Sequence, residues 1–176
     1  MMNFIETNIA EIWMLLLVVA TAVYILLESV LLYAALNGKL AVVRKFSANW
    51  DYSTTWAILA FGGLYATMPA WYAHLYSTAY ISLIIFLIGN IFKGASLEFL
   101  HNSGSRWFML AFQLGMGMIV FGVGGLLNEA IDMVLNVPHQ GVADSQMFLL
   151  WGTLVFLPAI IGYGVYNYWS LLVKKV

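Results

Sequence analysis

The feature that most constrains this sequence is a set of five long apolar runs with almost no charge inside them. They occupy residues 12–36, 53–73, 75–92, 107–127 and 147–170. A helix needs about 20 mostly apolar residues to cross the hydrocarbon core of a bilayer. Of the 176 residues, 9% are charged, whereas a soluble domain carries roughly 25%. We therefore predict an all-α integral membrane protein, a single transmembrane domain over residues 1–176, with about five transmembrane helices arranged as a four-helix bundle plus one additional helix.

The second and third runs meet with almost no linker between them. We expect a very tight turn around Pro69 to Ser77, which makes these two helices a close antiparallel hairpin. The remaining connections are residues 37–52, 93–106 and 128–146.

The basic residues give the orientation. Seven occur in the whole chain, and all fall in two of the connections or at the C-terminus: Lys39, Arg44, Lys45, Lys93, Arg106, Lys174 and Lys175. With five crossings these segments lie on one side of the membrane. The segments on the other side contain acidic residues but no Lys or Arg. Basic loops stay in the cytoplasm, so we predict an external N-terminus and a cytoplasmic C-terminus.

Composition excludes several classes of protein. A net charge of −1 argues against a nucleic-acid partner, which calls for a basic surface. The absence of cysteine excludes disulfides, thiolate metal sites and a cysteine nucleophile. The N-terminal residues carry Glu6 and Glu11 but no Lys or Arg, unlike a cleaved signal peptide, so we expect the first run to stay in the mature protein.

Glu28 is the one carboxylate well inside a predicted span. It lies roughly 12 Å from the cytoplasmic end of the first helix, at 1.5 Å per residue. A charge at the centre of a membrane helix costs at least ~2.5–3.5 kcal/mol on insertion scales, and no predicted span contains a Lys or Arg to pair with it. We therefore expect Glu28 to be protonated or hydrogen-bonded much of the time.

Thr21 and Tyr24 lie on the same helical face as Glu28 and complete a polar stripe. One interpretation is a structural hydrogen bond from Glu28 to another helix or subunit. The other is a proton path or ligand site, because ionisable groups inside a membrane usually serve function.

Asp51 precedes the second apolar run and has two interpretations. As a helix N-cap, it accepts a hydrogen bond from the backbone N–H of Ser53 or Thr54. As a proton acceptor on the cytoplasmic side, it begins a chain of hydroxyls at Ser53, Thr54 and Thr55 that leads inward to Glu28.

The histidines argue against a haem held by this chain alone. A membrane-embedded b-type haem usually needs two imidazoles that face each other inside the bundle. His74, His101 and His139 all fall in predicted turns or loops. The sequence also lacks HExxH and any cluster of histidine with carboxylates, so we predict no metal site.

Glycines repeat every seven residues in the fourth run, as Gly115 with Gly122 and as Gly117 with Gly124. Small residues allow helices to approach closely in a membrane. We expect helix packing at these positions, with a ligand groove as the alternative.

Residues 50–99 resemble subunit II of the cytochrome bd quinol oxidases. The matching positions are Trp50-Asp51, Trp56, Gly62-Gly63, Leu64-Tyr65-Ala66, Pro69, Tyr72, Ser77, Tyr80 and Glu98-Phe99, and Phe92-Lys93 stands where the family has Phe-Arg. The chain departs from the family pattern at Leu26 to Val30, where the family has Gly-Phe-Asp-Met-Gly, and at Tyr52 to Thr55, where it has Gly-Asn-Gln-Val. Family members are about twice as long, so this chain resembles their N-terminal half.

The resemblance implies a haem-free, non-catalytic subunit of a respiratory quinol:oxygen oxidoreductase in a prokaryotic inner membrane. Haem b and haem d are then expected in the partner subunit I, quinol as the substrate of the complex, and a second half-length subunit II-like chain as a further partner. This chain would support the haem subunit and contribute a cytoplasmic proton path. In that path Asp51 is the entrance, Glu28 the relay, and Tyr24, Ser53, Thr54 and Thr55 the connecting hydroxyls.

Two other functions stay open. A non-catalytic membrane anchor or assembly protein predicts that Glu28 faces a hydrogen-bond partner with no water route to Asp51. A small proton-coupled transporter predicts activity of the isolated chain in liposomes, with Glu28 as the coupling site.

Overall fold

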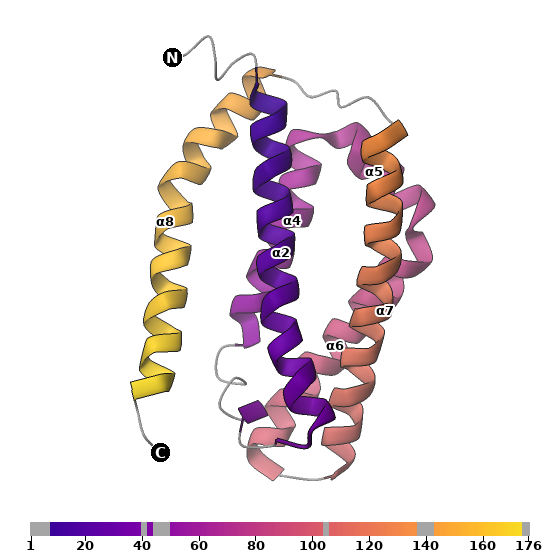
Figure 1. Cartoon of the computed structure of the whole chain (residues 1–176), viewed down its shortest axis with the longest axis vertical. Helices are drawn as coiled ribbons and strands as arrows, with labels where there is room; N and C mark the ends of the chain where they lie inside the picture. The colour runs from indigo at the N-terminus through magenta and orange to yellow at the C-terminus, as the bar shows by residue number, and fades with distance from the viewer. Residues whose placement is uncertain (1–7, 40–41, 44–49, 104–105, 137–142, 174–176) are drawn as a thin grey trace.

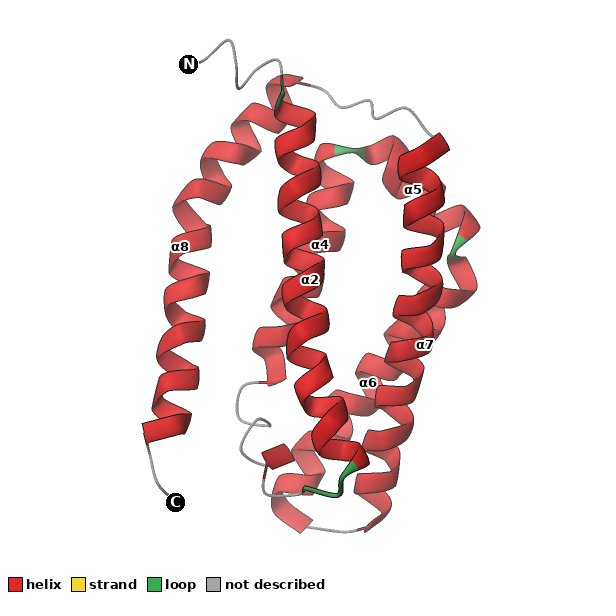
Figure 2. Cartoon of the chain, viewed as in Figure 1, coloured by secondary structure: helices red, strands yellow, loops and turns green. Residues whose placement is uncertain are grey.

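The computed structural model describes residues 8–39, 42–43, 50–103, 106–136 and 143–173, and its regular structure in these ranges is entirely α-helical (Figure 2). The chain order is α2 (Ile9–Leu36), α4 (Trp50–Thr67), α5 (Pro69–Thr78), α6 (Tyr80–Ser103), α7 (Arg106–Asn136) and α8 (Ala143–Val173). The predicted all-α class is confirmed.

The long helices run alternately up and down (Figure 1). α2, α6 and α8 end at the lower end of the molecule as drawn, and α7 begins there. α4 also begins toward that end, but its first turn lies higher than the last turn of α2. α2 and α6 are therefore parallel to each other, and α4 and α7 run the other way.

Four of the five predicted spans are confirmed by length and composition. Within the described residues, the helices apolar enough to cross a membrane are Ile9–Leu36, Tyr80–Phe99, Arg106–Asn136 and Ser145–Tyr166. The helix α4, which forms most of the predicted second span, is not among them. Its 18 residues are long enough, but its first turns are rich in polar side chains, which lower its hydropathy. It packs beside α2 all the same.

The predicted tight turn around Pro69 to Ser77 is wrong. These residues form the ten-residue helix α5, and Pro69 occupies its first turn, where the missing proline N–H costs no hydrogen bond. The chain changes direction instead at Met68 and at Ala79, the residues that flank α5. The second span therefore ends at Thr67, and the third begins at Tyr80.

The predicted end of the third span, residue 92, is also wrong, because α6 continues to Ser103. Lys93, which the sequence pattern assigned to a cytoplasmic loop, lies inside α6 with none of its surface exposed. Among the described basic residues, Lys39 and Arg106 are exposed at the lower end of the bundle. The charge asymmetry at the loops persists without Lys93.

Glycines bring α6 and α7 into close contact. A Cβ on Gly115 would lie 2.8 Å from the backbone N of Lys93, and one on Gly122 would lie 2.7 Å from that of Phe86. Gly117 has nothing within 4 Å of such an atom, and neither has Gly124. The expectation of helix packing is thus confirmed for Gly115 and Gly122, whereas the other pair faces outward.

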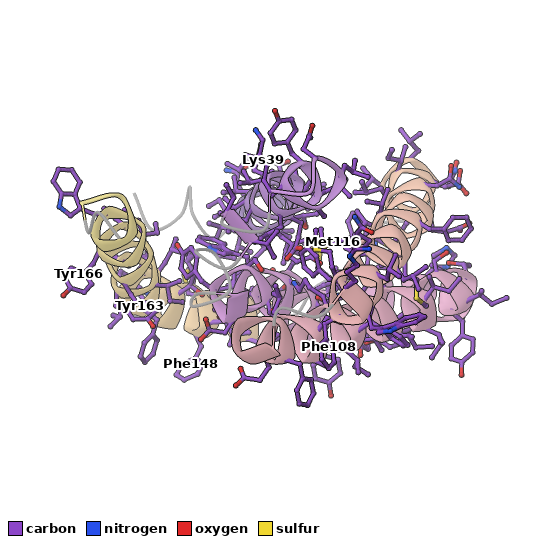
Figure 3. All side chains as sticks on the ribbon, turned by 90° about the horizontal axis from the view of Figure 1, so that it is seen from below. Lys39, Phe108, Met116, Phe148, Tyr163 and Tyr166 are labelled. Atoms are coloured by element: carbon purple, nitrogen blue, oxygen red, sulfur yellow. The ribbon has the colours of Figure 1, made fainter. Side chains whose placement is uncertain are left out.

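The helix α8 stands apart from the rest of the bundle when the molecule is seen from below (Figure 3). Only 6% of its most apolar window is buried, compared with 33% for α7. Its upper end is nevertheless anchored. Gln146 donates a hydrogen bond from Nε2 to the carbonyl of Thr67 at 2.9 Å, and its own carbonyl accepts one from Trp13 Nε1 at 3.0 Å. These contacts join α8 to α2 and to the break between α4 and α5.

Candidate functional site

A buried ion pair lies at the contact between α2 and α6. Lys93 Nζ lies 2.6 Å from Glu28 Oε1, and the two side chains are 0% and 6% exposed. The expectation that Glu28 has no cationic partner within the membrane spans is therefore wrong. The ammonium supplies the compensating charge that a carboxylate at this depth needs, because a buried ion is stable only when it is paired and hydrogen-bonded.

The local sequence explains why Lys93 points inward. Phe86, Asn90 and Lys93 follow one another at intervals of four and three residues, so they share one face of α6. Phe86 and Lys93 are buried, and Asn90 is partly buried. Gly115 of α7 allows the turn that carries Lys93 to sit directly against it.

One signal in the sequence could have revealed the pair. Lys93 is followed by Gly94, Ala95, Ser96 and Leu97, a stretch without charge. A helix with such small and apolar residues beyond the lysine has no reason to end at residue 92. The spacing from Phe86 then places Lys93 on the buried face.

Tyr24 and Asn90 lie one turn above the ion pair. The Tyr24 ring contacts the Phe86 ring edge to face at 5.8 Å between centroids, and its centroid lies 6.0 Å from Lys93 Nζ. Asn90 donates from Nδ2 to the carbonyl of Phe86 at 2.9 Å. Tyr24 and Glu28, which were predicted to share a helical face, thus belong to a larger cluster that includes Asn90 and Lys93 of α6.

Three buried oxygen atoms of this cluster have no hydrogen-bond partner among the described residues. They are the Tyr24 hydroxyl, Glu28 Oε2 and Asn90 Oδ1. An unsatisfied buried polar atom costs roughly 1–3 kcal/mol. Such groups are few in a folded protein, and each calls for an explanation.

The other member of the predicted polar stripe, Thr21, is only partly buried. Its hydroxyl donates to the carbonyl of Leu17 at 2.8 Å, so it is bonded within its own helix. It lines an apolar cavity of about 340 Å³ above the cluster, between α2, α4, α5 and α7. Tyr24 and Phe86 also line this cavity, which places them between the apolar space and the ion pair.

The second candidate carboxylate, Asp51, is exposed in the first turn of α4. The described helix begins one residue earlier, so Asp51 lies within the helix rather than before it. Negative charge in a first turn is favourable because of the helix dipole. The environment of Asp51 thus differs from that of Glu28 in both exposure and pairing.

The hydroxyl residues after Asp51 differ among themselves. Ser53 is buried, with 2% of its surface exposed, and Thr54 and Thr55 are partly buried. Thr55 donates its hydroxyl to the backbone carbonyl of Asp51 at 3.0 Å. Of the three hydroxyl residues, only Ser53 is thus fully inside the bundle, two residues after the exposed Asp51.

The described residues give little support for a metal centre. No group of three or more His, Cys, Asp or Glu side chains gathers in this part of the chain. His74 lies partly buried in α5. The side chain of His101 and the whole of His139 lie outside the described residues.

Comparison with known protein families identifies the chain. The sequence matches the family "Cytochrome bd terminal oxidase subunit II" over residues 9–142, and the chain belongs to this family. A search of curated proteins finds no match. The matched region includes Glu28, Asp51 and Lys93, and the predicted family is confirmed.

Proposed function

We propose that this chain is a haem-free subunit of a bd-type quinol:oxygen oxidoreductase that supports the haem-bearing subunit and contributes part of a proton path. Membership of the family supports the association with such a complex. The observation that carries the proton role is the buried Glu28 with a second, unpartnered carboxylate oxygen. Ionisable groups inside a membrane mark proton and ion pathways.

In the proposed path, Asp51 collects protons at the start of α4. Its exposed position suits exchange with water. Ser53, Thr54 and Thr55 carry the path inward from Asp51; Ser53 is buried and the two threonines are partly buried. Tyr24 and Glu28 receive it inside the bundle.

Lys93 sets a condition on this path. If Glu28 took up a proton and kept it, the ammonium of Lys93 would remain buried with no counter-charge, which is strongly unfavourable. Proton passage through Glu28 is therefore transient. It uses Oε2, because Oε1 stays bound to Lys93 at 2.6 Å.

The proposed orientation has the N-terminus outside and the C-terminus in the cytoplasm of a prokaryotic cell. It requires that α4 also crosses the membrane, in addition to the four candidate spans. Lys39 and Arg106 are exposed at one end of the bundle, and the acidic Asp132 lies near the far end of α7. Basic residues favour the cytoplasmic side. In this orientation Asp51 and Glu28 both lie toward the cytoplasmic side.

Haem b and haem d are assigned to the partner subunit I, and quinol to the complex as its substrate. The described part of this chain offers no paired imidazoles to hold a haem. Because the resemblance implies a subunit about twice as long as this chain, we also propose a second half-length chain as a partner.

The assembly of the complex tests this function first. The tagged chain is purified from its native membranes, and a reduced-minus-oxidised spectrum is recorded. A haem d band in the purified complex, together with quinol-dependent oxygen consumption, is the expected result. Purification without any haem subunit would contradict the proposal.

An anchor or assembly role is the second candidate, and the ion pair itself favours it, because a buried Glu–Lys contact fixes how α2 meets α6. The two roles differ in what happens when charge is removed without loss of packing. The anchor tolerates a neutral pair of the same shape, whereas the proton path needs the Glu28 carboxylate. Transport by the isolated chain in liposomes, without a haem subunit, would favour a proton-coupled transporter instead.

A further inference from the structure

Three unpartnered oxygen atoms come from two adjacent turns of α2 and one turn of α6. Tyr24 and Glu28 are one helical turn apart on α2, and Asn90 is one turn before Lys93 on α6. The helices α2 and α6 run in the same direction (Figure 1). The Glu28–Lys93 ion pair and the ring contact between Tyr24 and Phe86 bring these turns together. The Tyr24 hydroxyl lies within interaction distance of both Asn90 and Glu28, yet no partner meets it with the geometry of a full hydrogen bond.

The chemistry of the three atoms is complementary to one small molecule. Glu28 Oε2 and Asn90 Oδ1 accept hydrogen bonds, and the Tyr24 hydroxyl can donate one. The bond from Asn90 Nδ2 to the carbonyl of Phe86 at 2.9 Å fixes the orientation of the amide, and Oδ1 is the atom left without a partner. A water molecule has two donors and can accept from the tyrosine, so its hydrogen-bonding capacity matches that of the three atoms. Buried waters in proteins typically make about three such hydrogen bonds.

A metal cation fits the same oxygen atoms less well. The ammonium of Lys93 already neutralises Glu28 at 2.6 Å, and a second positive charge beside it would be repelled in a medium of low dielectric constant. An apolar ligand leaves the oxygen atoms unsatisfied. The adjoining cavity of about 340 Å³ is apolar; Tyr24 and Phe86 line it, whereas Glu28 is not among its lining residues.

We propose that Tyr24, Glu28 and Asn90 form a binding site for an internal water molecule, which lies on the free carboxylate oxygen of Glu28. This site deepens the proposed proton path and rests on it for its role: the water supplies Oε2 with a proton donor and acceptor while Oε1 stays with Lys93. Tyr24 and Asn90 are then positioning residues for that water.

Infrared spectroscopy of the purified complex tests the site. Spectra are recorded in ordinary water and in water labelled with oxygen-18, and an internal water gives an O–H stretching band that shifts with the label. We expect this band in the wild type and its loss in Tyr24→Phe, which keeps the ring and removes only the donor. Asn90→Leu removes the acceptor and should also abolish the band. Tyr65→Phe is the matched control, because Tyr65 is 62% exposed and its variant should keep the band.

The outcomes separate this site from the proton path. A label-sensitive band that persists in both Tyr24→Phe and Asn90→Leu, or its absence from the wild type, overturns the water site whatever the turnover. A band lost in both variants supports the site. If the complex nevertheless turns over normally without the Glu28 carboxylate, the proton path is wrong and the water site stands.

Discussion

Two buried polar clusters lie at different heights in the bundle and differ in how completely they are bonded. At the upper end, Gln146 links Trp13 and the carbonyl of Thr67 by two hydrogen bonds of 3.0 and 2.9 Å. At the lower cluster, the Glu28–Lys93 pair is made at 2.6 Å, but three nearby oxygen atoms lack a partner. Both clusters join helices that are distant in the sequence.

The difference separates structure from chemistry. Where Met68 interrupts the helix and α5 begins, the carbonyl of Thr67 is satisfied by Gln146, as stability requires of a buried backbone group. The lower cluster keeps acceptors and a hydroxyl unbonded next to a charge, which is costly for stability alone. We therefore assign the upper cluster to the fold and the lower one to function.

The largest expected effect follows from breaking the ion pair on one side only. Glu28→Gln leaves Lys93 buried without a counter-charge, and Lys93→Met leaves Glu28 in the same situation. Removing one partner of a buried pair costs about 3–5 kcal/mol, so both variants should assemble poorly. The yield of purified complex and its thermal unfolding temperature measure this loss.

The double variant Glu28→Gln/Lys93→Met is the control for that prediction. It keeps similar side-chain volume without either charge, and such replacements are often neutral or stabilising. Assembly should return to near the wild-type level. A double variant as unstable as the singles would show that the charges are not the cause.

A close glycine contact should affect the lower cluster selectively. In Gly115→Leu the new side chain meets the backbone of Lys93, where a Cβ alone would lie at 2.8 Å. Overpacking of this kind costs about 1–3 kcal/mol and displaces the turn that carries the lysine. Gly117→Leu is the matched control on the same helix, since nothing lies within 4 Å of its Cβ position. Thermal unfolding in detergent measures the stability of both variants. Equal losses of stability in the two would contradict the packing described for α6 and α7.

Loss of the upper cluster should reduce stability without changing chemistry. Gln146→Leu leaves the buried carbonyl of Thr67 without a hydrogen-bond donor and removes one link between α8 and the rest of the bundle. The expected cost is about 1–3 kcal/mol. The complex that does assemble should consume oxygen at the wild-type rate per haem. A lower rate per haem would place the upper cluster in the function as well.

The smallest effect on stability is expected at Asp51. Asp51→Asn changes an exposed side chain, and surface substitutions usually stay within about 0.5 kcal/mol. If Asp51 collects protons, turnover should fall several-fold, most at high pH where free protons are scarce. Asp132→Asn is the control, since Asp132 is also exposed but lies near the far end of α7 and accepts a hydrogen bond from Asn136 at 2.9 Å. Oxygen consumption across a range of pH compares them, and equal rates in the two variants would remove Asp51 from the path.

Much of the fold could be predicted from the sequence, because long apolar runs have few alternatives to membrane helices. The runs that became α2, α6, α7 and α8 were placed to within several residues at most of their ends. What failed lay at the boundaries. Pro69 was read as a turn residue although it also suits a helix start.

The site could be predicted only in part. The depth of Glu28 and its place beside Tyr24 followed from helix periodicity, and both residues are buried. Its partner was missed because a lysine after an apolar run was assigned to the loop by the usual cost of burying charge. Burying either Glu28 or Lys93 alone is costly, but burying them as an ion pair is tolerated. That pairing can be recognised only when the relative positions of α2 and α6 are known. Asn90 was missed for the same reason.

The central claim is that the Glu28 carboxylate carries protons rather than only fixing a helix contact. The most direct measurement is quinol-driven oxygen consumption, per haem d, by assembled complexes of wild type and of Glu28→Gln/Lys93→Met. We predict a turnover at least tenfold lower in the double variant although it assembles normally. Equal turnover in the two complexes would contradict the claim and leave the pair a purely structural role.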